Sequence, residues 1–208
     1  MAKVFLEGFY DKATGQMHRQ LLANNLLPLT QPFNTAPWNY TGIETVNSIP
    51  ANVTDWILVV SRTADGTPIS QAAGFINQTG ELFSIDGTKG IALDQVMGNH
   101  FSIHHRSHLA ILSAQPYEGV MVDFTTTANL AQGNAAMKNV NGILCLYAGD
   151  YDGTGIINSI DFNAWKADGA ALNQYLPIDG DGNGIINTSD YNLWINNRSK
   201  VGEPGVRY

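Results

Sequence analysis

The chain has 208 residues, of which 44% are hydrophobic and 14% are charged, and its formal net charge is -7 at neutral pH. A disordered chain holds fewer apolar residues and a nucleic-acid-binding chain carries basic runs, so the composition argues against both classes. No apolar stretch is long enough to span a membrane, and the single cysteine, Cys145, excludes an internal disulfide. The length suffices for one full domain and a smaller one.

The N-terminal quarter of the chain mixes strand-like segments with loops. Residues 3–11 read KVFLEGFYD, and the alternation of their apolar side chains predicts an opening strand. Residues 17–29 predict a strand followed by a proline-bounded loop, with a short helix as the alternative. Residues 31–52 are rich in Pro, Asn, Thr and Gly, which predicts a long ordered loop that crosses a sheet edge.

A series of short strands is predicted next. The strongest is residues 54–63, TDWILVVSRT, whose unbroken apolar run indicates a central strand buried on both faces. The sequence ADGT at residues 64–67 then predicts a hairpin turn. Further strands are expected at residues 69–75, 81–85, 90–93, 101–105, 108–113, 120–124 and 142–147, with a polar helix or loop at residues 125–138. Because no helices alternate with these strands, the sequence predicts a mainly β fold, an antiparallel β-sandwich.

Two copies of an acidic loop follow the strands. Loop one, residues 150–161, reads DYDGTGIINSID, and loop two, residues 179–190, reads DGDGNGIINTSD. Both place oxygen-bearing side chains at loop positions 1, 3, 5, 9 and 12 and a glycine at position 6, which is the ligand pattern of an EF-hand-type calcium loop. Calcium takes about six to eight oxygen ligands, so a short loop must turn sharply at Gly155 or Gly184 to collect them. Ordinary Asp- and Gly-rich turns are the alternative, which the matched second copy disfavours.

The predicted ligands of two Ca²⁺ ions are side chains, except at position 7, where the backbone carbonyl serves. They are Asp150, Asp152, Thr154, Ile156, Asn158 and Asp161 in loop one and Asp179, Asp181, Asn183, Ile185, Asn187 and Asp190 in loop two. Thr154 is a neutral and weaker ligand, so we expect loop one to bind calcium more weakly than loop two. Ile157 and Ile186, at position 8, are expected to pair the two loops in a shared core.

The duplicated loop, with a short helix after each copy, resembles a dockerin module over residues 148–200. The resemblance implies a small α-helical calcium-binding domain that docks onto cohesin modules in extracellular multi-enzyme complexes. It further implies that Ser159, Ile160, Thr188 and Ser189 contact the partner. Ile160 departs from the family pattern, which has a small hydroxyl residue there, and the basic pair usual in the following helix is also missing.

The segment before the loops is similar to β-sandwich modules found near the C-termini of large secreted bacterial proteins. The similarity is carried by LEGFYD, APWNYTG, DWILVVSR and IHHRSHLAILSA. We therefore expect a β-sandwich module at residues 1–147, a tandem calcium-loop domain at residues 148–201 and a tail at residues 202–208. The N-terminal residues lack the apolar core of an export signal, which predicts a fragment of a larger exported polypeptide or an added initiator Met.

The predicted function is that of a secreted or cell-surface, non-catalytic module that binds calcium and docks onto a protein partner. Two alternatives stay open: a structural subunit that assembles with copies of itself, and a carbohydrate-binding module that takes a polysaccharide. For the latter, Trp38, Tyr40, Trp56 and Tyr117 are a candidate stacking platform, although Trp56 is expected in the core and Trp38 at one end of the sandwich.

Four histidines, at positions 100, 104, 105 and 108, form the other notable cluster. In a continuous strand His104 and His108 would share a face, so a two-His zinc site is conceivable. The sequence places no thiol or carboxylate near them to complete a catalytic set. We therefore expect strand-edge histidines that support turns through hydrogen bonds, and no enzyme.

Overall fold

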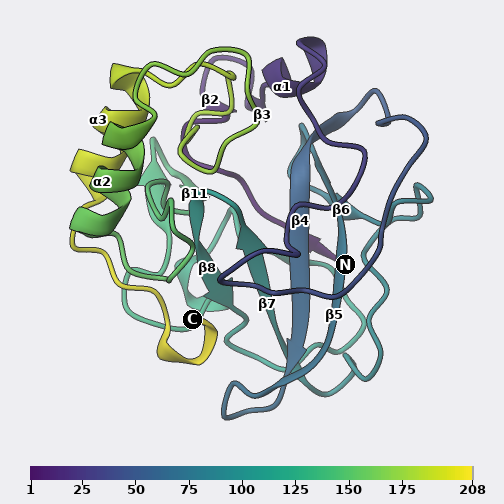
Figure 1. The fold of residues 1–208 in the computed structure, drawn as a ribbon. Coiled ribbons are helices and arrows are strands. Elements are labelled where there is room, and N and C mark those ends of the chain that lie inside the picture. Colours follow the sequence, from purple (N-terminus) through teal and green to yellow (C-terminus); the bar gives the residue numbers. More distant parts are fainter. Residues whose placement is uncertain (208) are drawn as a thin grey trace.

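A computed structural model describes residues 1–207 of the chain. The protein is mainly β with few helices (Figure 1). Its main element is a five-stranded antiparallel sheet with the strand order β6-β5-β4-β7-β8. The strands are β4 (Val53–Arg62), β5 (Pro68–Asn77), β6 (Leu82–Phe83), β7 (His100–His105) and β8 (His108–Leu112).

Strand β4 is the centre of this sheet, as its apolar run predicts. All of its residues are buried, and it pairs with β5 on one side and with β7 on the other. The ring of Trp56 in β4 lies 4.2 Å from that of Phe75 in β5, measured between centroids. The predicted hairpin turn closes through the bond from the Thr63 N–H to the Thr67 carbonyl at 2.9 Å. Tight packing on both faces makes β4 the fixed element on which the other segments are placed.

The remaining strands are short and form three two-stranded pairs. They are β1 (Ala2–Lys3) with β9 (Val122–Asp123), β2 (Tyr10–Asp11) with β3 (Gln16–Met17), and β10 (Lys138–Val140) with β11 (Ile143–Cys145). The β1–β9 pair is parallel, so the strand pairing is not antiparallel throughout as expected. Cys145 is buried in β11.

The predicted continuous strand over residues 3–11 is wrong. The chain turns between β1 and β2, where Gly8 has a φ of +85° and the Tyr10 N–H donates to the Leu6 carbonyl at 3.0 Å. A left-handed φ suits glycine because it has no Cβ, and the turn ends the strand. Leu6 and Phe9 are nevertheless buried, so the apolar pattern correctly indicated which side chains are buried but not that the backbone is extended.

Other boundaries also differ from the expectation. The strand predicted in residues 17–29 ends at Met17, and the segment contains a short helix, α1 (Gln20–Ala23), which is the alternative that the sequence left open. Residues 90–93 form no strand, since only Gly90 pairs, in an isolated bridge to Phe83. The polar segment at 125–138 holds one 3-10 turn, η1 (Ala128–Leu130), and a second, η2 (Pro204–Val206), lies near the C-terminus. The predicted loop over residues 31–52 is confirmed, because it contains no helix or strand.

Two helices follow the two acidic loops directly. They are α2 (Ser159–Ala167) and α3 (Thr188–Asn197), and they lie side by side on the β8 side of the sheet (Figure 1). Each begins with a capping box in which an Asn and the Asp three residues later exchange hydrogen bonds with each other's backbone. Aromatic rings join the helices, with centroids 5.0 Å apart for Phe162 and Trp194 and 5.3 Å apart for Trp165 and Tyr191.

The expected pairing of the two loops through their position-8 isoleucines is wrong. The Ile157 N–H donates to the Lys200 carbonyl and the Ile186 N–H to the Ala171 carbonyl, both at 2.9 Å. Ile157 packs with Leu109 of β8 and with Tyr147, whereas Ile186 belongs to a separate cluster, and Trp194 contacts both clusters. Each loop is therefore paired with a segment outside itself, and an aromatic residue of α3 links the two.

The loop region packs directly on the N-terminal part of the chain. A Cβ added to Gly8 would lie 2.8 Å from the Gly180 carbonyl oxygen in loop two, so the backbones meet closely there. At Gly153 in loop one, an added Cβ would lie 2.8 Å from Trp38. Within residues 1–207, no helix has both the length and the apolar character needed to cross a membrane.

Candidate metal centre

Three carboxylates converge within loop one. Asp150, Asp152 and Asp161, at loop positions 1, 3 and 12, each offer an oxygen, and these atoms all lie within 4.8 Å of one another. Asp150 and Asp161 are buried, with 2% and 0% of their surface exposed. Buried, like-charged groups at this separation are costly unless something compensates their charge.

Backbone N–H groups hold these carboxylates in place. The Gly155 N–H donates to Asp150 at 3.0 Å, which the sharp turn at position 6 makes possible. The N–H groups of Tyr151 and Asp152 donate to the same oxygen of Asp161, at 2.7 and 3.0 Å. The loop thus closes on its own carboxylates, and its twelve-residue spacing is sufficient to gather them.

Loop two repeats this geometry. Asp179, Asp181 and Asp190 likewise offer oxygens that lie within 4.8 Å of one another. The Gly184 N–H donates to Asp179 at 3.0 Å, and the Gly180 N–H donates to Asp190 at 2.9 Å. The sequence repeat therefore corresponds to a repeat of the same three-carboxylate arrangement.

The pKa values of these carboxyl groups reflect their crowding. Burial, followed by the charges of Asp161 and Asp152, raises the pKa of Asp150 well above its ordinary value. Burial likewise raises the pKa of Asp179 to about 7 and that of Asp190 to about 6. Since the charged forms are disfavoured, a bound cation would stabilise the site. Carboxylate oxygens on a short loop are the donor set that suits a hard cation such as Ca²⁺.

The other predicted ligands lie in the loops but bond to neighbouring groups. The Thr154 hydroxyl donates to Asp152 at 2.7 Å. The side chain of Asn158 accepts from the Ile160 N–H at 2.7 Å and donates to the carbonyl of Ile156 at 3.1 Å. In loop two Asn187 has the same role, and Asn183 accepts from the Ile185 N–H at 2.7 Å. These positions shape the turn and cap the helix, and their ligand role stays a prediction.

The four predicted partner-contact residues lie at the first turns of α2 and α3. Ser159, Ile160 and Thr188 are exposed, and Ile160 has 59% of its surface accessible. Ser189 is half-buried, and its hydroxyl donates to the Asp181 carboxylate. Its polar atom therefore faces loop two rather than a potential partner.

The histidine cluster differs from the sequence prediction. The chain reverses after His105, so His105 pairs with His108 across the hairpin, and their Nδ1 atoms lie 2.9 Å apart. The conceivable zinc pair of His104 and His108 on one strand face is therefore wrong. All four histidines are buried rather than placed at an open strand edge.

A carboxylate does stand next to these histidines, contrary to expectation. Asp55 in β4 lies 3.1 Å from the Nε2 of His105, and the Ser107 hydroxyl lies 3.2 Å from the Nδ1 of the same ring. The sequence signal that could have found Asp55 is its charge directly before the apolar run of β4. Asp55, His105 and Ser107 are 0–1% exposed, so the array lies inside the protein and not at its surface.

The aromatic residues considered for carbohydrate stacking do not share a surface. Trp56 is fully buried, and Trp38 is 9% exposed, with its ring edge-on to Phe33 at 5.3 Å. The Tyr40 hydroxyl donates to Glu44. An exposed platform of the four aromatic residues is therefore not formed.

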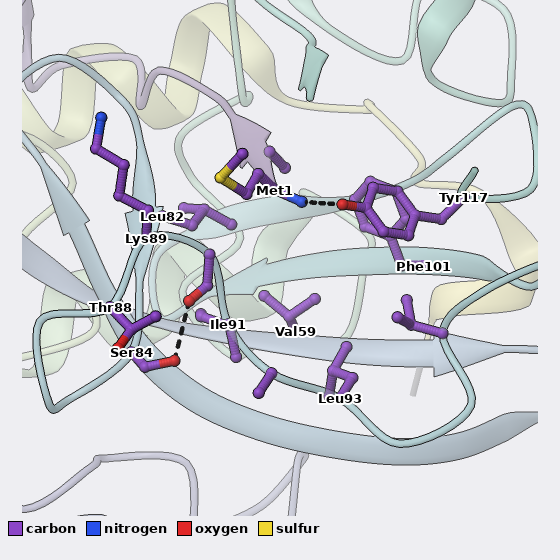
Figure 2. Close-up of a pocket in the computed structure, with 14 residues that line it drawn as sticks. Met1, Val59, Leu82, Ser84, Thr88, Lys89, Ile91, Leu93, Phe101 and Tyr117 are labelled. Carbon is purple, nitrogen blue, oxygen red and sulfur yellow. Dashed lines mark hydrogen bonds between the residues drawn. The ribbon is translucent and has the colours of Figure 1, made fainter. Parts of the chain in front are cut away.

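A cavity of about 300 Å³ lies against the sheet, away from the loops (Figure 2). Its lining includes Val59, Leu82, Leu93 and Phe101, and the N-terminal amine bonds to the Tyr117 hydroxyl at its edge. Among the described residues that line it there is no Asp, Glu, His or Cys. The lining is mostly apolar, and its polar groups are the N-terminal amine, the Lys89 amine and the hydroxyls of Ser84, Thr88 and Tyr117.

Comparisons with known proteins identify no family for this chain. No protein-family model matches the sequence, and no curated protein matches it significantly. Two crystal structures from Acetivibrio cellulolyticus resemble the chain, an N-terminal and a C-terminal interface mutant of a type II cohesin–X-dockerin complex. Their TM-scores are 0.42 and 0.41 at 15% and 14% identity, with 71% of this chain and 82% of the matched chain covered. Likeness at this level supports no inference about fold or function.

Proposed function

We propose that the protein is a non-catalytic calcium-binding module that holds two Ca²⁺ ions, one in each acidic loop. The observation that carries this proposal is the duplicated convergence of three carboxylates, at positions 1, 3 and 12 of both loops. One such cluster can arise by chance on a surface, but here two carboxylates of each cluster are buried. The position-6 glycine N–H also donates to the position-1 carboxylate in both loops. Crowded, buried carboxylates of this kind are stabilised by a divalent cation.

The same proposal assigns the protein to docking outside the cell. Loops with neutral ligands at several positions suit the high calcium concentrations of extracellular fluid. The exposed first turns of α2 and α3 offer Ser159, Ile160 and Thr188 to a protein partner, as expected for a dockerin-like domain at residues 148–201 beside a β-sandwich module at residues 1–147. The partner proposed is a cohesin-like module.

Self-assembly is a second candidate, favoured by exposed apolar side chains in the loop region. Leu172 and Ile185 form an isolated bridge and expose 60% and 41% of their surfaces, and Val201 exposes 56%. A second copy of the chain would cover such residues. Light scattering with and without calcium separates the two candidates, because only self-assembly increases the particle mass in the absence of another protein.

Calorimetric titration of chelator-treated protein with Ca²⁺ tests the metal proposal. We expect two ions per chain in the parent and one in each of the variants Asp150→Asn and Asp179→Asn, which keep the side-chain shape but remove a position-1 charge. The matched variant Asp65→Asn changes an exposed carboxylate in the β4–β5 turn and should keep both sites. No calcium binding by the parent would refute the proposal. A panel of immobilised cohesin modules then tests the partner, with Ile160→Asp expected to weaken any capture.

A further inference from the structure

A single buried arginine connects the main sheet with loop two. Arg106 lies in the turn between β7 and β8, and 2% of its surface is exposed. Its Nε donates to the Asp55 carboxylate of β4 at 3.2 Å. Burial alone would raise the pKa of Asp55, but Arg106 and then His105 hold it at about 2, so this carboxylate is ionised. The guanidinium is therefore anchored on the most buried strand of the protein.

The other side of the guanidinium contacts the residues at which loop two begins. Its Nη1 donates to the backbone carbonyls of Leu176 and Asp179, the latter at 3.2 Å. Its Nη2 lies 3.8 Å from the Asp179 carboxylate and makes no hydrogen bond. The ring of Tyr175 covers the guanidinium at 4.4 Å, and the Tyr175 hydroxyl donates to Asp55 at 2.7 Å. Arg106 thus fixes both the backbone and the first carboxylate of the loop.

Loop one has no equivalent. Over residues 1–207, no Lys, Arg or His side chain forms an ion pair with Asp150, Asp152 or Asp161. Loop one is held by its own backbone donors, by backbone hydrogen bonds with residues 199–202, and by packing of Trp38 on Gly153 and of the Arg207 side-chain carbons on Gly155. The two loops therefore have the same internal geometry but different electrostatic surroundings.

We infer that Arg106 is a resident counter-ion and positioning residue that keeps loop two folded without a metal ion, so that loop one is the calcium-dependent member of the pair. A fixed positive charge next to Asp179 offsets part of the repulsion that opposes closure of the loop, and its two carbonyl contacts fix the chain where the loop begins. Loop one lacks this charge, so its carboxylates separate when calcium is removed. The calcium dependence of loop one rests on the proposed function. The ordering of loop two by Arg106 does not require a metal ion.

Amide hydrogen exchange of the full chain in chelator tests this inference directly. We expect the amides of residues 175–190 to exchange at least about tenfold more slowly than those of residues 150–161, with the difference reduced when calcium is added. Equal exchange of the two loops in chelator would overturn the inference, whether or not any variant folds. Failure of the proposed function is seen separately, as an absence of calcium binding in calorimetry.

The double variant Arg106→Gln, Asp55→Asn removes the counter-ion of Asp179 without leaving the carboxylate of Asp55 buried and unpaired. We expect exchange in residues 175–190 to rise in chelator to the level of loop one, while the amides of β4 keep their protection. Arg62→Gln is the matched control, because it removes a buried arginine at the opposite end of β4, and it should leave the ratio between the loops unchanged. If the double variant loses protection equally in β4 and loop two, or keeps slow exchange in loop two, Arg106 is not a positioning residue for the loop.

Discussion

The indole N–H of Trp194 donates to the backbone carbonyl of Asn158 at 2.8 Å, so the helix that leaves loop two supports the end of loop one. The reverse contact also exists, since the indole of Trp165 in α2 donates to the carbonyl of Asn187 in loop two at 3.2 Å. Each acidic loop is therefore completed by the helix of the other. These two indole hydrogen bonds join the two loop–helix units, whereas the isoleucines at loop position 8 do not pair with each other.

Replacing Trp194 with Phe keeps an aromatic ring but removes the hydrogen bond to loop one. We expect a loss of about 1–2 kcal/mol in the free energy of unfolding, because the Asn158 carbonyl loses its donor. Urea unfolding of calcium-loaded protein measures this loss. Trp165→Phe is the matched variant on the other loop and should have a smaller effect, since its hydrogen bond is longer. A larger loss for Trp165→Phe would contradict the assigned roles.

Calcium should stabilise the whole protein, because residues 148–200 pack on the sheet. A ligand that binds only the folded state at about a hundred times its dissociation constant adds about 2.7 kcal/mol per site. We therefore expect thermal unfolding to shift to higher temperature with calcium and back after chelation. Magnesium is the control ion, because it prefers a smaller octahedral site and should give a smaller shift. An identical unfolding temperature in calcium and in chelator would contradict calcium binding at either loop.

Buried histidines should make the sheet sensitive to acid. Burial, and then the charge of Arg62, lowers the pKa of His104 from 6.5 to about 3. The folded state therefore keeps the ring neutral. Its contribution to stability is fully present above about pH 6.5 and is lost as the pH falls toward 3, by about 1.4 kcal/mol per pH unit. His105 and His108, whose pKa values burial also lowers, act in the same direction.

The variant His104→Gln isolates the contribution of this ring. Between about pH 6 and pH 5, its free energy of unfolding should fall less steeply than that of the parent, by about 1.4 kcal/mol per pH unit. Urea unfolding at fixed calcium over this range measures both slopes. Gln can still bond to the Ser102 hydroxyl, which lies 2.8 Å from the His104 ring nitrogen. Parallel slopes for the two proteins would show that His104 titrates normally.

Asn197 at the end of α3 should be important for attachment of the helices to the sheet. Its amide donates to the buried carboxylate of Glu7 and to the Ala148 carbonyl at 2.9 Å, and its oxygen accepts from Lys138 at 2.9 Å. Burial raises the pKa of Glu7, so this carboxyl depends on its donors. Asn197→Ala should cost about 2–3 kcal/mol of stability, because it removes the hydrogen bonds that Asn197 donates to the buried Glu7 carboxylate and to the Ala148 carbonyl. Asn196→Ala, at the exposed neighbouring position, is the control for helix propensity and should be near neutral.

Structural features that depend only on residues close together in the sequence were predictable. The apolar run of β4 indicated a strand buried on both faces, and the glycine and aspartate spacing of each loop indicated which carboxylates converge. The helices after the loops also followed, because each loop ends in an Asn–Asp capping pair. In the segment from residue 3 to residue 11, the same reasoning failed. Its apolar pattern is equally compatible with a strand and with a buried turn at Gly8.

The sequence by itself determined which carboxylates converge in the two acidic loops, because the spacing of each loop places positions 1, 3 and 12 against its own backbone N–H groups. Only the tertiary structure decided that Arg106 reaches both Asp55 and Asp179, and that Trp194 supports loop one. The partners in these contacts are separated by tens of residues in the chain. They meet because the packing of the sheet against the helices fixes their positions. A local sequence pattern does not indicate which distant residues this packing brings together.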